Sequence, residues 1–160
     1  MAGTIALVLS IAYLALARLD RLPFVLEAIA LFVAIRSLFL TLTHIAPFPT
    51  RMVFDSSLFA RLDFGGDLFF SGHAGLPFLL ALLFWDHVRL RCYFLALSVL
   101  FAAVVLLGHL HYSIDVASAY FITFGIYHIA LKLFPRDHAV FLDERDRMDP
   151  AFPSRSREVR

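Results

Sequence analysis

Two short polar stretches of this chain gather residue types that can do chemistry. Residues 66–73 read GDLFFSGH, and residues 109–115 read HLHYSID. Each stretch lies where a long apolar run begins, so both place titratable groups at the mouth of an expected membrane helix. Such groups are costly there and usually serve a function. We expect the two stretches to meet and to form one catalytic site at one face of a membrane.

The second stretch contains an imidazole and a carboxylate at helical spacing. His111 and Asp115 are four residues apart and would share one face of a helix. The carboxylate can then accept the Nδ1–H of the imidazole and fix its tautomer. Nε2 is left free to attack an electrophile or to take a proton.

The first stretch predicts a cradle for an anion. His73 opens an expected helix, whose unpaired N–H groups and positive dipole end favour a phosphate. Ser71 can cap that helix, and Gly72 allows the backbone to approach a ligand closely. Two imidazoles facing each other across a phosphate suit in-line phosphoryl transfer through a phosphohistidine.

Three more residues are candidates for substrate contact. Arg36 is a charge within an apolar run, so it either reaches the substrate phosphate or pairs inside the bundle. Asp67 either orients His73, binds a headgroup amine or simply forms a turn. Tyr112 either contacts substrate or belongs to the aromatic belt at the membrane surface.

The elements that must position these residues are membrane helices. The chain has 160 residues, 61% of them hydrophobic, which exceeds the usual share in a soluble domain. We expect an all-α polytopic bundle of about five transmembrane helices, with residues 1–134 as the catalytic domain and 135–160 as a mobile polar cytoplasmic tail. Phe69 and Phe70 would have to lengthen the short third run. The apolar runs cover residues 3–17, 23–46, 72–85, 90–107 and 114–134.

Charge and cysteine usage narrow the class further. The single cysteine, Cys92, excludes an internal disulfide. The basic residues form no continuous stripe of the kind that binds nucleic acid. With five spans, the regions richest in basic residues fall on one side, which the positive-inside rule makes cytoplasmic. Both motifs then face the periplasmic or exoplasmic side, and the excess of arginine over lysine hints at a bacterial inner membrane. The basic residues on the cytoplasmic side are Arg18, Arg21, Arg89, Arg91, Lys132, Arg136 and the arginines of the tail, whereas the other side has only Arg51 and Arg61.

Residues 66–73 resemble the Gly-Asp-x-(Leu/Phe)-(Phe/Tyr)-Ser-Gly-His motif of the sphingomyelin synthase family, within the wider lipid phosphate phosphatase superfamily. Residues 111–120 are similar to that family's second motif, and residues 47–49 to its Pro-x-Pro turn. The resemblance implies that His111 is the nucleophile, Asp115 its orienting partner and His73 the acid for the leaving alkoxide. It also implies no metal and no cofactor. Ala74 replaces the usual Thr, and one of the family's six spans is missing.

Several functions fit this pattern. The first is transfer of a phospho-headgroup from a glycerophospholipid to ceramide or another lipid alcohol. The second is hydrolysis by the same histidines, as in a lipid phosphatase or a phospholipase-C-like enzyme. A third, a haem or metal carrier, leaves Asp115 and the Ser-Gly-His triplet without a role, and an inactive family member is a fourth. The carrier would use His44, His109, His111 and His128.

Overall fold

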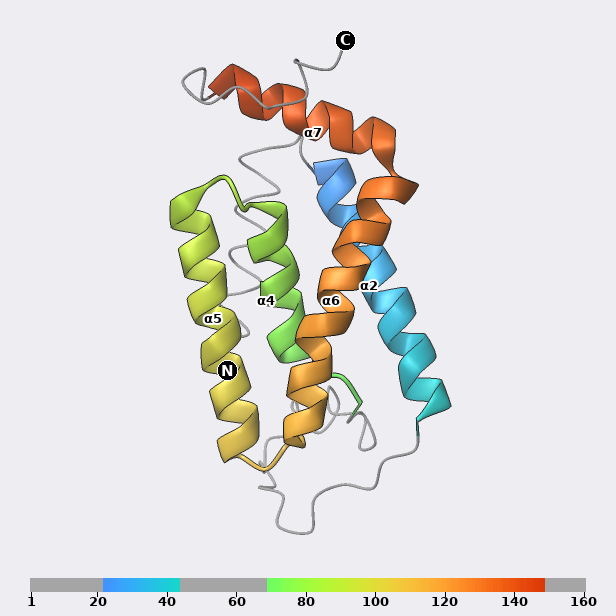
Figure 1. Cartoon of the computed structure of the whole chain (residues 1–160), viewed down its shortest axis with the longest axis vertical. Helices are drawn as coiled ribbons and strands as arrows, with labels where there is room; N and C mark the ends of the chain where they lie inside the picture. The colour runs from blue at the N-terminus through green and yellow to red at the C-terminus, as the bar shows by residue number, and fades with distance from the viewer. Residues whose placement is uncertain (1–21, 44–68, 149–160) are drawn as a thin grey trace, which may run out of the picture.

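The computed structural model describes residues 22–43 and 69–148, and every regular element in these ranges is a helix. Figure 1 shows most of the helices running along the long axis, whereas the helix of residues 135–148 crosses one end. The expected all-α bundle is therefore confirmed for the described residues, whereas the run at 3–17 lies outside them. The helices are α2 (Leu22–Leu42), α4 (Gly72–Leu83), α5 (Val88–Leu107), α6 (Ser113–Leu133) and α7 (Pro135–Met148).

Helices α2, α5 and α6 are long and apolar enough to cross a membrane. They contain 21, 20 and 21 residues, and at 1.5 Å per residue each spans about 30 Å, the thickness of a bilayer's hydrocarbon core. Large apolar side chains point away from the bundle along them, for example Phe121, which is 80% exposed. These surfaces are suited to contact with lipid tails.

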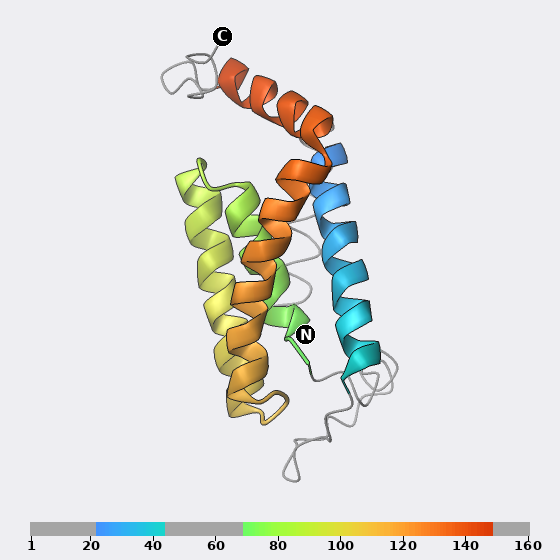
Figure 2. The same ribbon diagram turned by 45° about the vertical axis from the view of Figure 1, so that its right-hand side comes forward.

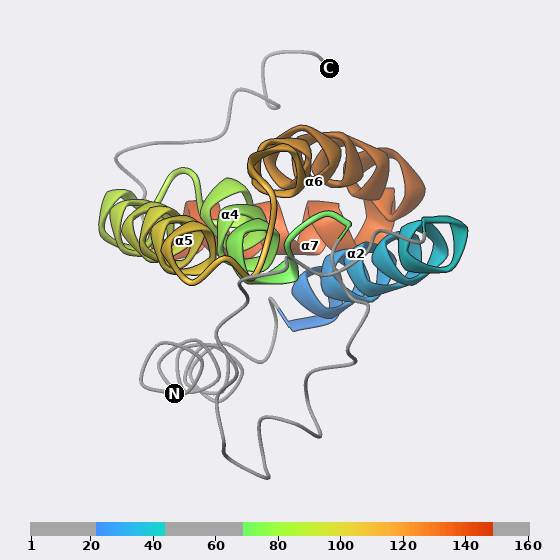
Figure 3. The same ribbon diagram turned by 90° about the horizontal axis from the view of Figure 1, so that it is seen from below.

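Helix α4 is shorter than the third run predicts. It has 12 residues and rises only about 18 Å. Phe69 and Phe70 do not lengthen it, because they form a bend and Phe70 has a φ of 26°, outside the helical region. Eight of its residues are buried, and Figure 3 shows it at the centre, between α5 on one side and α6 and α2 on the other. The short helix is thus surrounded by longer ones.

Aromatic packing defines one end of the bundle. The ring of Phe141 in α7 lies 5.6 Å from that of Phe24 at the start of α2 and 5.9 Å from that of Phe84 at the end of α4. The opposite end contains the end of α2 and the starts of α4 and α6 (Figure 1). Consecutive helices therefore alternate in direction, and the basic residues Arg89 and Lys132 lie towards the α7 end.

Helix α7 is an element that the sequence does not predict. Residues 135–160 read as one polar tail, yet residues 135–148 form a helix that lies across the end of the bundle (Figure 2). Pro135 occupies its first position, where the missing N–H costs nothing. Phe141 is only 6% exposed and the ring of His138 lies 5.0 Å from that of Phe24, so these two side chains join the polar helix to the core.

Candidate active site

The two polar motifs meet at the end of the bundle opposite α7. The backbone N–H of Ser71 donates to the backbone carbonyl of Asp115 over 3.1 Å. This bond joins the residue before α4 directly to the first turn of α6. Segments more than forty residues apart in the sequence are therefore in backbone contact.

A helix-ending turn positions His111. After α5, the N–H of Leu110 donates to the carbonyl of Val105 over 2.9 Å, and the N–H of His109 to that of Leu106 over 3.1 Å. These two bonds form a Schellman motif, in which the residue after the helix adopts a left-handed conformation. That residue is His109, with a φ of 51°. The turn directs the chain back towards the bundle, so that His111 is 7% exposed.

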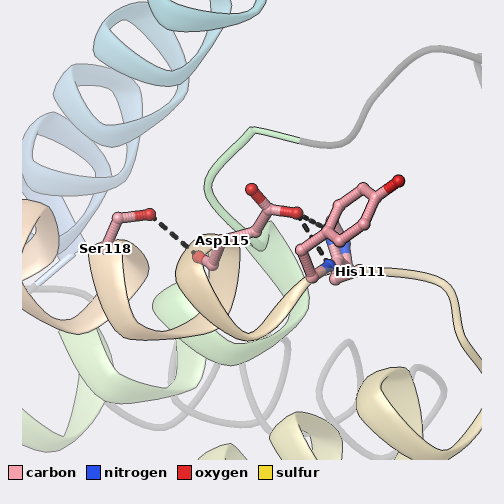
Figure 4. A network of polar contacts seen from close by, with 4 residues as sticks. His111, Asp115 and Ser118 are labelled. Carbon is pink, nitrogen blue, oxygen red and sulfur yellow. Dashed lines mark hydrogen bonds and ion pairs between the residues drawn. The ribbon is translucent and has the colours of Figure 1, made fainter. Parts of the chain in front are cut away.

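The side-chain carboxylate of Asp115 has two partners, which are drawn in Figure 4. Its Oδ2 accepts the backbone N–H of Tyr112 over 2.9 Å and lies 3.8 Å from Nδ1 of His111. Ser118 donates to the backbone carbonyl of the same Asp115 over 3.1 Å. The carboxylate is fully buried, and its Oδ1 has no hydrogen-bond partner among the described residues. Asp115 thus stabilises the start of α6 and the imidazole beside it.

The pairing of His111 with Asp115 has a different origin from the one that the sequence predicts. Helical spacing suggested that both would lie on one helix face, but α6 begins at Ser113. His111 precedes the helix, with Tyr112 at the N-cap. The turn after α5, rather than the i, i+4 geometry of a helix, therefore brings the imidazole to the carboxylate.

A buried phenylalanine anchors the first motif to α2. The ring of Phe70 makes edge-to-face contacts with Phe32 and Phe39, at centroid distances of 5.5 and 6.0 Å. A bulky residue with positive φ is strained by about 1–3 kcal/mol, and such strain gathers at functional sites. Phe70 is fully buried, so its packing offsets this strain and fixes where α4 begins.

Ser71 occupies the N-cap position of α4, as the sequence predicts, but its side chain does not cap the helix. The hydroxyl is fully buried and has no hydrogen-bond partner among the described residues. A buried hydroxyl at a helix N-terminus is suited to contact an anionic ligand. The expected capping bond is therefore absent, while the expected position is correct.

Arg36 of α2 lies against Gly72. A Cβ atom added to Gly72 would be 2.8 Å from Nε of Arg36 and 3.2 Å from its Cζ. Only glycine lets the guanidinium approach the first turn of α4 so closely. A fixed positive charge and the positive end of the α4 dipole thus occur at the same place, which favours binding of an anion.

His73 lies in the first turn of α4 and is exposed. Its ring packs edge-on against Phe101 of α5, with centroids 6.1 Å apart. Tyr112 is half-buried and contributes its backbone to the start of α6. Asp67, the remaining candidate from the sequence, lies outside the described residues.

Of the histidines proposed for a metal or haem carrier, those that the structure describes form no metal-ligand group. His128 stacks against Phe124 and Tyr127, and it lies 13 residues beyond Asp115 along α6, a rise of about 20 Å. His44 lies outside the described ranges. Within the part of the chain that the structure describes, no three His, Cys, Asp or Glu side chains are grouped as metal ligands.

We expect Gly72→Ala to lower kcat/KM for a phospholipid substrate by about 10-fold to 10²-fold, because a displacement of about 1 Å at a site can have that effect. The new methyl group would push the Arg36 head away from α4. Kinetics in lipid vesicles measure the loss.

Gly125→Ala is the matched control, since a Cβ there meets nothing within 4 Å. In an Arg36→Ala background, Gly72→Ala should cause little further loss. An equal loss with and without Arg36 would show that the guanidinium is not the group displaced.

Sequence reasoning used Phe70 only to lengthen the third apolar run and did not predict the turn at His109, yet both position the site. Neither left-handed conformation has a clear sequence signal, because Gly108 beside His109 is the residue that usually adopts it. The burial of Phe70 depends on α2, which the local sequence does not place.

Part of the chain matches a known protein family. Residues 65–132 match the PAP2 superfamily C-terminal family model, a range that contains His73, His111 and Asp115 but not Arg36. No curated protein and no solved structure matches the chain. The family match supports the assignment of this part of the chain to the PAP2, or lipid phosphate phosphatase, superfamily.

Proposed function

We propose that this chain is a membrane phosphotransferase that moves a phospho-headgroup from a glycerophospholipid to ceramide or another lipid alcohol. The observation that carries the proposal is the contact between His111 and Asp115, in which Nδ1 lies 3.8 Å from Oδ2. The backbone carbonyl of Asp115 also accepts the N–H of Ser71, just before α4. The family match supports an enzyme that acts on phosphorylated lipids. Transfer to a lipid alcohol comes from the motif resemblance to sphingomyelin synthases.

In the first step, Nε2 of His111 forms a bond to phosphorus and the bond to the diacylglycerol oxygen breaks. Protonated His73 gives its proton to the departing alkoxide. The buried carboxylate of Asp115 beside Nδ1 stabilises the positive phosphoimidazole. Arg36 and the α4 N-terminus stabilise charge on the phosphoryl oxygens.

In the second step, neutral His73 takes the proton of the acceptor hydroxyl. The acceptor oxygen bonds to phosphorus while the N–P bond breaks, which regenerates His111. Asp67 and Tyr112 remain candidate headgroup contacts. Metal and cofactor have no part in this scheme.

Sidedness completes the proposal. Arg89, Arg91, Lys132 and Arg136 lie towards the end of the bundle opposite the site. By the positive-inside rule that end is cytoplasmic, and the site then opens to the periplasmic or exoplasmic side of a membrane, in our proposal the bacterial inner membrane.

Hydrolysis is the second candidate function, and two observations favour it. His73 is exposed, which offers a route for water, and the matched superfamily includes phosphatases. Water would replace the lipid alcohol in the second step, and the products would be diacylglycerol and a free phospho-headgroup.

The test uses purified protein in vesicles with fluorescent ceramide and, separately, a phospholipid with a radiolabelled headgroup. Transfer predicts a new phosphosphingolipid in equal amount to the diacylglycerol formed. Hydrolysis predicts a water-soluble labelled headgroup and unchanged ceramide. Acid-labile, base-stable label on the protein would identify the phosphohistidine. If neither product forms with phosphatidylcholine, phosphatidylethanolamine, phosphatidylinositol or phosphatidate, the proposed function is wrong.

A further inference from the structure

Ser98 is a buried polar residue in the middle of the apolar helix α5. Its side chain is fully buried. Its Oγ lies 2.7 Å from the backbone carbonyl of Ala74 in α4 and 3.1 Å from the hydroxyl of Tyr120 in α6. One hydroxyl therefore contacts the helices that carry both halves of the site.

The number of hydrogens that each group can donate fixes the direction of both hydrogen bonds. The carbonyl of Ala74 can only accept, so the single hydrogen of the Ser98 hydroxyl points to it. Ser98 must then accept the hydrogen of the Tyr120 hydroxyl. The result is an ordered chain from Tyr120 through Ser98 to Ala74, in which each bond polarises the next.

These hydrogen bonds join α4, α5 and α6 close to the candidate catalytic residues. Ala74 directly follows His73, and Tyr120 lies five residues after Asp115 on the same helix. The ring of Tyr120 also packs edge-on against Phe78 of α4, with centroids 5.0 Å apart. The contacts fix the rotation of the first turn of α4 relative to α6.

The first turn of α4 is weak without such support. Pro77 lies inside the helix and has no N–H to donate to the carbonyl of His73, four residues earlier. The turn that carries His73 therefore lacks one of its internal helical bonds. The bond from Ser98 holds the next carbonyl from outside the helix.

We propose that Ser98 and Tyr120 are positioning residues that set the imidazole of His73 against the His111–Asp115 pair. The catalytic consequence rests on the proposed function, since it assumes that His73 moves the proton of the leaving and attacking oxygens. The hydrogen-bonded link itself does not depend on that assumption, so the two are tested separately.

The kinetic test compares Ser98→Ala, Ser98→Thr and Tyr120→Phe. Ser98→Ala should lower kcat by about tenfold with KM unchanged, because the hydroxyl does not touch substrate. Ser98→Thr keeps the hydroxyl and should restore most of kcat. Tyr120→Phe removes only the outer donor and should have an intermediate effect.

Thr123→Val is the matched control. Thr123 in α6 is equally buried, and its hydroxyl has no hydrogen-bond partner among the described residues. Valine keeps its shape and removes the hydroxyl, so kcat should stay at the wild-type value. If Thr123→Val lowered kcat as much as Ser98→Ala, removal of any buried hydroxyl would explain the loss, and the proposal would be overturned.

Hydrogen–deuterium exchange provides a readout that needs no substrate. The backbone amides of residues 72–76 and of Phe78 should exchange faster in Ser98→Ala than in wild type or Thr123→Val. If no lipid is turned over, faster exchange still supports the link while the proposed function fails. Wild-type exchange together with wild-type kcat overturns the proposal, and Tyr120→Phe decides the matter if Ser98→Ala does not fold.

Discussion

His111→Ala is expected to reduce turnover of the phospholipid donor by at least about 10⁴-fold, as removal of a nucleophile does in other covalent catalysts. His111 is the only buried histidine among the described residues, and Oδ2 of Asp115 lies 3.8 Å from its Nδ1. His73→Ala should be less severe, about 10²-fold to 10⁴-fold, because general acid–base catalysis contributes that much. Initial rates of diacylglycerol release measure both.

The control is His128→Ala, which removes an imidazole from α6 far from the site and should keep wild-type turnover. The two site variants also separate the steps. His111→Ala should incorporate no acid-labile label, whereas His73→Ala should still form some labelled protein. Wild-type turnover in His111→Ala would refute its role as the nucleophile.

Asp115→Asn should lower kcat by up to about 10⁴-fold while lipid binding stays unchanged, by analogy with the tautomer-fixing aspartate of serine proteases. The amide keeps an oxygen that can accept the N–H of Tyr112, so the start of α6 is preserved. Its NH₂ group, however, can present a donor to His111 and favour the wrong tautomer. Steady-state kinetics and a fluorescent-lipid binding assay measure the two properties.

Asp115→Ala tests how much of the loss of kcat comes from a destabilised α6 rather than from the wrong tautomer of His111. It removes the capping acceptor as well, and loss of a cap destabilises a protein by about 1 kcal/mol. We therefore expect Asp115→Ala to lower the thermal midpoint and Asp115→Asn to leave it near the wild-type value. Equal loss of stability in both would mean that the negative charge of the carboxylate, rather than its capping oxygen, stabilises the start of α6.

Hydropathy alone located the three long helices well, because an apolar run of about twenty residues has few alternatives to a membrane span. The expected run at 114–134 corresponds to α6, Ser113–Leu133. The same signal overestimated α4, since Phe69 and Phe70 are apolar without being helical. It missed α7 because burial of Phe141 arises from tertiary packing on Phe24 and Phe84.

The site was predictable in its parts and less so in its assembly. Alternation of the spans places both motifs at one end, and the sequence is sufficient for that inference. The contact between Arg36 and Gly72 depends on how α2 packs on α4, which no local pattern encodes. Ser98 gave no signal of its own, because single hydroxyls in apolar runs are common. Tyr120 belongs to the second motif, but its contact with Ser98 depends on how α5 packs on α6.

Cys92, the only cysteine in the sequence, is exposed near the start of α5, at the end of the bundle that α7 crosses. The candidate site and this cysteine thus lie at opposite ends of the bundle. A membrane-impermeant maleimide added to intact cells or to inverted vesicles therefore distinguishes the two orientations of the protein. Cys92 therefore serves as a topology marker without any engineered cysteine.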